Sequence, residues 1–120
     1  MDGAHNPAGA VAVAAHLDAS GLSGRVDLVF GALSDKAVEA MFGPLAARAR
    51  RVVLVAPSSP RALPPDLLAG RLGRPDLARA ASLSEALSSL EEAGNEAPIL
   101  VAGSLVLAGE ALALAGSRDA

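Results

Sequence analysis

The sequence contains no cysteine, tryptophan or tyrosine, and Phe30 and Phe42 are its only phenylalanines. The absence of cysteine excludes a disulfide scaffold and thiolate metal sites, and it is consistent with a cytoplasmic protein. Because nucleic-acid bases stack on aromatic side chains, so few rings argue against single-stranded nucleic-acid binding. The hydrophobic core has to be built from alanine, valine and leucine.

Long charged runs and long apolar runs are missing as well. The net charge is −3 without a long basic or acidic run, so neither DNA nor an anionic membrane is expected as a main partner. No apolar run reaches the ~18 residues that a membrane-spanning helix needs. The first residues carry Asp2 and His5 in place of a basic segment before an apolar stretch, so no signal peptide is expected.

The composition that remains fits one folded domain. Hydrophobic residues make up 52% of the 120 residues. That length suits a single domain and leaves no room for two of ordinary size. A chain of this size buries roughly two-thirds of the surface that its unfolded form exposes, which is enough for a core.

Short apolar runs alternate with helical patterns along the chain. The helices expected from these patterns cover residues 7–18, 35–49, 66–72 and 82–93, and a last one ends near residue 116. The expected strands cover residues 25–30, 51–56 and 99–102, while 75–81 is open between a short edge strand and a loop. We therefore expect an α/β fold, a three-layer α/β/α sandwich with a mostly parallel, Rossmann-like sheet, over residues 1–116, with 117–120 as a tail.

Three of the expected helices carry local signals. Asn6 is the expected N-cap of the first helix, with Pro7 at its first position. Ser82 followed by Glu85 is typical of a capping box. Gly43-Pro44 predicts a kink in the helix over 35–49. The apolar residues expected to share one face of the first helix are Val11, Ala14, Ala15 and Leu17.

Asp2 to Pro7 is the first of three polar junctions before a helix, where parallel sheets place their ligands. If a strand precedes Asp2, its carboxylate lies at the carboxyl edge of the sheet and can accept two hydrogen bonds from a ribose diol. His5 lies at the mouth of the helix, where it can donate to a phosphate or carboxylate. The alternative is that Asn6 and Pro7 are only a cap and His5 is a surface residue.

The other two junctions follow the strands over 25–30 and 99–102. Lys36 is expected in a first helical turn, where a cation opposes the helix dipole by roughly 0.3–1 kcal/mol, and an anionic partner would remove that conflict. Gly103 lets a ligand approach the backbone, and the Ser104 hydroxyl can bind an anion together with free helix N–H groups. The alternatives are a solvated lysine and a serine that is only an N-cap.

A loop over residues 58–62 adds Arg61, whose guanidinium can hold a carboxylate in a bidentate way, although an ordinary exposed arginine is the default. His16 is interpreted as structural. With two histidines and no clustered acids at ligand spacing, no metal site is expected within this chain. No P-loop motif is present, so the chain has no triphosphate cradle of that type.

Together these segments resemble the C-terminal domain of folylpolyglutamate synthase / dihydrofolate synthase, in the Mur ligase superfamily. The matching segments, in the family's order, are Asp2-Gly-Ala-His-Asn-Pro7, Gly31-Ala-Leu-Ser-Asp-Lys36, Pro60-Arg-Ala-Leu-Pro64 and Gly103-Ser-Leu-Val-Leu107. The first is shared by several amide ligases of the superfamily, whereas the others point to the folate branch. One departure is Val106, where a tyrosine is common in the family.

The resemblance implies a two-domain ligase that uses ATP to add L-glutamate to folate or dihydropteroate through an acyl phosphate. The family's N-terminal domain holds the P-loop, the ligands of Mg²⁺ and most of the folate site. Its C-terminal domain closes over the cleft, contacts ATP and binds the incoming glutamate. This chain is therefore expected to be inactive alone and to need the missing N-terminal ATPase domain as its partner.

Position by position, the resemblance implies that Asp2 holds the ATP ribose, and that His5 is catalytic and faces the phosphates or the glutamate. Ser104 would help to bind a glutamate carboxylate, and Lys36 and Arg61 are weaker candidates for the same substrate. The place of Asp2 at the very start predicts that a strand precedes it in a longer protein. Two alternatives are a related Mur-type peptide ligase domain and a free-standing module that binds a nucleotide or an amino acid.

Overall fold

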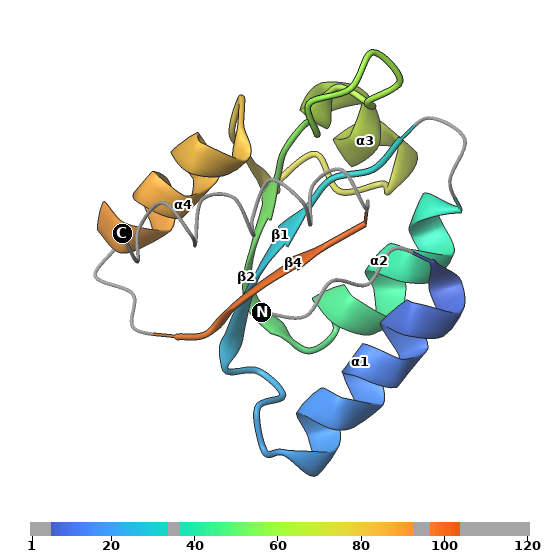
Figure 1. Ribbon diagram of the computed structural model, residues 1–120, viewed down its shortest axis with the longest axis vertical. Coiled ribbons are helices and arrows are strands. Elements are labelled where there is room, and N and C mark those ends of the chain that lie inside the picture. Colours follow the sequence, from blue (N-terminus) through green and yellow to red (C-terminus); the bar gives the residue numbers. More distant parts are fainter. Residues whose placement is uncertain (1–5, 34–36, 93–96, 104–120) are drawn as a thin grey trace.

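The computed structural model describes residues 6–33, 37–92 and 97–103, and these residues form a parallel sheet with helices on both faces (Figure 1). The strands, in the order β3-β2-β1-β4 across the sheet, are β3 (Ala78–Arg79), β2 (Ala49–Leu54), β1 (Val26–Phe30) and β4 (Ile99–Ala102). The helices are α1 (Pro7–Ala19), α2 (Val38–Ala46), α3 (Pro65–Arg71) and α4 (Leu83–Glu92). All the described strand pairs are parallel.

The central strand β1 separates two apolar cores, because successive side chains of a strand point to opposite faces. Leu28 and Phe30 belong to the core that α1, α2 and α3 cover. Val29 belongs to the core beneath α4. All five residues of β1 are buried, as a strand covered on both faces requires. The predicted three-layer α/β/α sandwich with a Rossmann-like sheet is confirmed (Figure 1).

Helix α1 begins as its sequence predicts. The side-chain oxygen of Asn6 accepts a hydrogen bond from the Gly9 N–H at 2.7 Å, and Pro7 occupies the first helical position. The predicted buried face is wrong in part, since Val11 is 58% exposed and Ala15 is exposed. The helix is apolar almost all round, so its sequence does not mark one face. Its buried side chains are Ala10, Ala14 and Leu17, and Val13 is partly buried against the same core.

Helix α2 is shorter than predicted at its carboxyl end, and β2 starts earlier. The helix contains Pro44, whose ring removes one helical hydrogen bond, and it ends at Ala46. After the helix, the Gly24 N–H donates to the Arg48 carbonyl oxygen at 2.8 Å, just before β2 begins. Strand β2 therefore covers residues 49–54 in place of the predicted 51–56.

The helices α3 and α4 agree with their predicted ranges within a residue at each end. Residues 78–79 form the short edge strand that the sequence left open. Ser82 caps α4, because its hydroxyl accepts the Glu85 N–H at 3.2 Å. Among the hydrogen bonds of the described residues, the reciprocal bond from the Ser82 N–H to the Glu85 carboxylate is absent, so only half of the capping box forms. The predicted final helix and tail lie outside the described residues.

Candidate functional site

The loops that follow β1, β2 and β4 meet at the carboxyl edge of the sheet. The Gly31 N–H donates to the Ala102 carbonyl at 3.2 Å, which joins the end of β1 to the end of β4. The Val55 N–H donates to the Phe30 carbonyl at 3.0 Å, which joins the end of β2 to the end of β1. The sequence placed its candidate residues in these loops, and the fold brings the loops together.

Gly103 makes the closest of these contacts. Its φ of +107° belongs to a region that side chains other than glycine rarely adopt. A Cβ on this residue would overlap the Gly31 carbonyl oxygen and stand 3.1 Å from Cε1 of Phe30. The third junction therefore starts where two main chains touch, and glycine is the residue that permits it.

The Arg61 loop is fastened to the segment that follows β1. Leu33 and Ala62 form an isolated antiparallel bridge, and the Leu63 N–H donates to the Ala32 carbonyl at 2.9 Å. The Arg61 N–H donates to Oγ of Ser59 at 3.2 Å, which fixes the turn just before the bridge. The Arg61 side chain is exposed. The structure thus carries Arg61 beside the chain that leads to Lys36.

Four predicted site residues, Asp2, His5, Lys36 and Ser104, lie outside the described residues. One part of the argument for Lys36 is wrong. Helix α2 begins at Val38 with Ala37 as its N-cap, so Lys36 precedes the helix and is not in its first turn. The argument from a first helical turn therefore no longer applies, and Lys36 remains a candidate through its charge and its place after β1 in the sequence.

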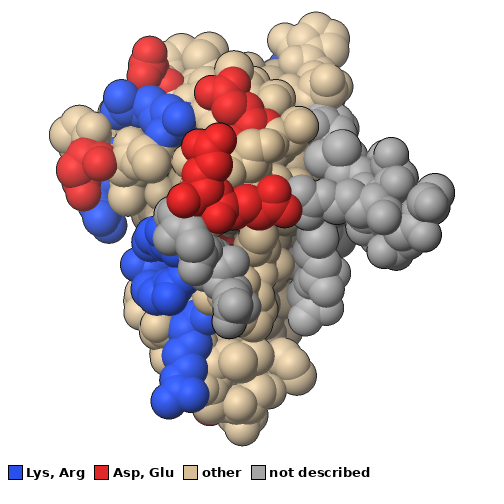
Figure 2. All heavy atoms as spheres, turned by 90° about the vertical axis from the view of Figure 1, so that its left-hand side faces the viewer, with Lys and Arg blue, Asp and Glu red and all other residues tan. Residues whose placement is uncertain are grey.

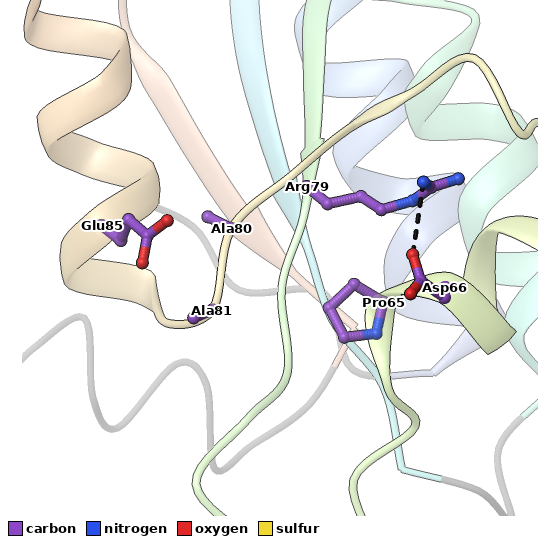
Figure 3. Close-up of a pocket in the computed structure, with 6 residues that line it drawn as sticks. All are labelled: Pro65, Asp66, Arg79, Ala80, Ala81 and Glu85. Atoms are coloured by element: carbon purple, nitrogen blue, oxygen red, sulfur yellow. Dashed lines mark ion pairs between the residues drawn. The ribbon is translucent and has the colours of Figure 1, made fainter.

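A second polar cluster at the carboxyl end of β3 was not predicted from the sequence. A cavity of about 230 Å³ lies between the starts of α3 and α4, with Arg79 and Asp66 on one side and Glu85 on the other (Figure 3). An Arg79 guanidinium nitrogen lies 3.2 Å from the Asp66 carboxylate, and another donates to the Pro75 carbonyl at 3.0 Å. Arg79 is thus held by the protein, which indicates that this cluster fastens the edge strand.

A buried acid was missed as well. Asp27 is fully buried in β1 and lies against Arg50 and Arg51. The signal for it was a single carboxylate within an otherwise apolar strand. In the described ranges, no group of three or more His, Asp or Glu side chains could hold a metal ion. No helix in those ranges is long and apolar enough to span a membrane.

A parallel sheet with helices on both faces and joined loops at its carboxyl edge defines a Rossmann-like α/β domain. Residues 1–105 match the family model described as "Mur ligase, glutamate ligase domain". The chain belongs to this family, and the resemblance that its four segments carry is confirmed. A comparison with curated proteins found no match.

Solved structures place the likeness within one branch of ligases. The chain is 34% identical to Mycobacterium tuberculosis folylpolyglutamate synthase complexed with ADP and AMPPCP, with a TM-score of 0.78, covering 95% of this chain and 28% of that one. The chain is 25% identical to E. coli FolC in complex with ADP, with a TM-score of 0.83, and the match covers 99% of this chain and 29% of that one. It is 29% identical to Thermotoga maritima folylpolyglutamate synthase, with a TM-score of 0.73, and that match covers 89% of this chain and 25% of that one. The chain therefore spans less than a third of the length of these proteins.

Proposed function

We propose that this chain is the C-terminal domain of an ATP-dependent ligase that adds L-glutamate to folate or dihydropteroate through an acyl phosphate. The observation that carries the proposal is the match to the glutamate ligase domain over residues 1–105, joined to a likeness of 34% identity with a folylpolyglutamate synthase. Because the chain corresponds to 28% of that synthase, the N-terminal ATPase domain is its proposed partner, and the chain alone is proposed to be inactive. A cytoplasmic location remains a prediction from the composition.

The proposed site lies along the joined loops at the carboxyl edge. ATP supplies the phosphoryl group that activates the folate carboxylate, and the Mg²⁺ ligands belong to the N-terminal domain in this proposal. Asp2 would accept hydrogen bonds from the ATP ribose, and His5 would face the phosphates or the glutamate. Both residues come just before the capped start of α1 in the sequence, at a helix terminus that favours anions.

The incoming glutamate is an anion, and the candidates proposed to bind it all offer donors. Ser104 follows Gly103, which lies against the Gly31 backbone. Arg61 is exposed on a loop that the Leu33–Ala62 bridge holds in place. Because the loop backbone is held, the Arg61 guanidinium can bind a carboxylate in a bidentate manner without the entropy cost of ordering a mobile loop. Lys36 would add a second positive charge three residues beyond Leu33 in the sequence.

The first test measures ADP release by the chain with ATP, a folate substrate and glutamate, alone and after addition of the N-terminal ATPase domain of a folylpolyglutamate synthase. We expect no turnover alone and glutamate-dependent turnover with both domains. Turnover by the chain alone would contradict the proposal. Activity on a cell-wall peptide precursor in place of folate would favour the related Mur-type ligase instead.

Single substitutions in the two-domain protein separate the roles. Asp2→Ala should raise the KM for ATP, and Ser104→Ala should raise the KM for glutamate. Ser84→Ala, an exposed serine on α4, is the matched control and should change neither. If Asp2→Ala and Ser104→Ala lowered only the melting temperature, both residues would be helix caps and the proposed site would be wrong.

A further inference from the structure

Two arginines at the start of β2 share one buried carboxylate. Val26 pairs with Ala49 and Asp27 pairs with Arg51, so Arg50 is an extra residue that makes a β-bulge. Asp27 alternates with Leu28 along β1 and therefore lies on the face that α4 covers. The face shown in Figure 2 carries a row of basic side chains that runs down one side, and its acidic side chains lie in the upper half.

The Asp27 carboxylate is already held by Arg50. The Nε and Nη2 atoms of Arg50 each lie 3.4 Å from a different carboxylate oxygen. Arg51 approaches the same carboxylate only through Nε, at 3.5 Å, and this buried Nε has no hydrogen bond within the described part of the chain. One carboxylate thus faces two guanidinium groups, and Arg51 carries the charge that is left over.

A cavity of about 340 Å³ lies beside Arg51, between the second half of α4, the middle of β2 and the start of β3. Its apolar lining includes Val53 and Leu90, which belong to the core beneath α4, and Ala78 of the edge strand. Ser89 adds a hydroxyl at the rim. A small cavity with mainly apolar walls and one cation is typical of a site for an organic ligand.

The one acid in the wall of this cavity does not cancel the charge of Arg51. Asp76 lies 3.2 Å from Nε of Arg74. The hydrogen bond from Arg74 holds the pKa of Asp76 below its ordinary value, so Asp76 is an anion that already has its own cation. Counting Asp76 with Arg74 and Asp27 with Arg50 leaves Arg51 as the uncompensated charge among these side chains.

We propose that this cavity binds a small amphipathic carboxylate. The terminal nitrogens of Arg51 would hold the carboxylate, and the aliphatic part of the ligand would pack against Val53, Ala78 and Leu90. The site is separate from the joined loops at the carboxyl edge, because none of the residues that line it belongs to those loops. Its ligand would bind to the 120-residue chain whether or not the proposed ligase function is correct.

The test is an NMR titration of the 120-residue chain with sodium hexanoate. We expect saturable shifts of the backbone amides of Val53, Ala78 and Ser89 at millimolar hexanoate. Hexanamide, which has the same length without the charge, and inorganic phosphate, which has charge without an apolar part, should bind much more weakly. Equal binding of either probe, or no saturable shift with hexanoate, would overturn the proposal.

Two variants separate the charge from the cavity. Arg51→Gln should weaken hexanoate binding by at least about tenfold, because a charge-assisted contact is lost. Ala78→Leu keeps Arg51 but fills part of the cavity, and it should weaken binding as well. Arg25→Gln, at an exposed arginine just before β1, is the control and should bind hexanoate like the unchanged chain. Unchanged affinity in both Arg51→Gln and Ala78→Leu would place the ligand elsewhere and contradict the proposal.

Discussion

Gly103 and Gly31 lie main chain against main chain at the ends of β4 and β1. A Cβ at Gly103 would overlap the Gly31 carbonyl oxygen and lie 3.0 Å from the Gly31 carbonyl carbon. The atoms in the way are backbone atoms, which cannot turn aside as the end of a side chain can. The contact therefore fixes the spacing between the two loops that carry the second and third candidate junctions.

Gly103→Ala should destabilise the domain by more than about 1 kcal/mol, because the new methyl group meets backbone and the positive φ is strained. Urea denaturation of the 120-residue chain measures the change. Gly70→Ala is the control, since nothing lies within 4 Å of the Cβ position of this helical glycine. It should be neutral or stabilising by up to about 1 kcal/mol. Equal stability of the two variants would show that the close contact has no energetic role.

Arg50 and Arg51 should differ in their effect on stability. Arg50→Gln removes both contacts of 3.4 Å to the buried Asp27 and should cost about 1–2 kcal/mol, less than a fully buried pair because Arg50 is exposed. Arg51→Gln leaves those contacts in place and should cost less than about 0.5 kcal/mol. Chemical denaturation of both variants at neutral pH decides the order, and a reversed order would contradict the assignment of Asp27 to Arg50.

The Asp18–Arg48 pair predicts a pH dependence of stability. The hydrogen bond from Nε of Arg48, at 3.0 Å, holds the pKa of the Asp18 carboxyl below its ordinary value. A carboxyl group whose pKa is lowered by folding stabilises the folded state above its unfolded pKa. That stabilisation is lost as the pH falls through the folded pKa. Asp18→Asn should therefore be less stable than the unchanged chain at neutral pH, and the difference should shrink in acid.

Urea denaturation over a pH series measures this difference, and NMR measures the pKa of Asp18 directly. In Arg48→Gln the pKa of Asp18 should rise toward its ordinary value. A pKa that stayed low in Arg48→Gln would show that another group holds the charge of Asp18.

The two phenylalanines form the one aromatic contact that the sequence allows. Their ring centroids are 5.2 Å apart at an interplanar angle of 70°, an edge-to-face arrangement, and Phe30 is fully buried. Phe42→Ala should cost about 3–5 kcal/mol, as truncation of a buried ring does. Val11→Ala removes an exposed side chain and should stay within about 0.5 kcal/mol. Thermal unfolding of both variants measures the contrast, and a small effect of Phe42→Ala would mean that the core fills the space.

The sequence predicted the elements whose signals are local. Asn6 and Pro7 mark the start of α1 because a cap is a contact between neighbours in the chain, and the continuous apolar run of β1 marks a strand buried on both faces. The buried face of α1 was predicted only in part, since an alanine-rich helix is apolar on every side and tertiary packing makes the choice. The boundary between α2 and β2 depends on the bond between Gly24 and Arg48, which lie far apart in the sequence.

The candidate site shows the same division. The sequence placed Arg61 and the segment leading to Lys36 in separate loops, and it could not show that the Leu33–Ala62 bridge joins them. It did not indicate that Gly31 and Gly103 touch. Asp27 was missed, although it is the one acid in an otherwise apolar strand. Its arginine partners come from a bulge, and no local pattern predicts the extra residue. Contacts between residues close together in the sequence could be predicted, whereas contacts between residues far apart in the sequence could not.

The bonds that join the loops at the carboxyl edge also limit how this domain can diversify. Backbone contacts link the ends of β1 and β4, and the Leu33–Ala62 bridge links the loop after β1 to the loop after β2. Lengthening any one of these loops would strain the others, so insertions are disfavoured there. Under the proposed function, a change of substrate preference would instead come from exchanging side chains such as Arg61 on an unchanged backbone. Libraries for altering specificity should therefore vary residue identity at this edge and keep loop length constant.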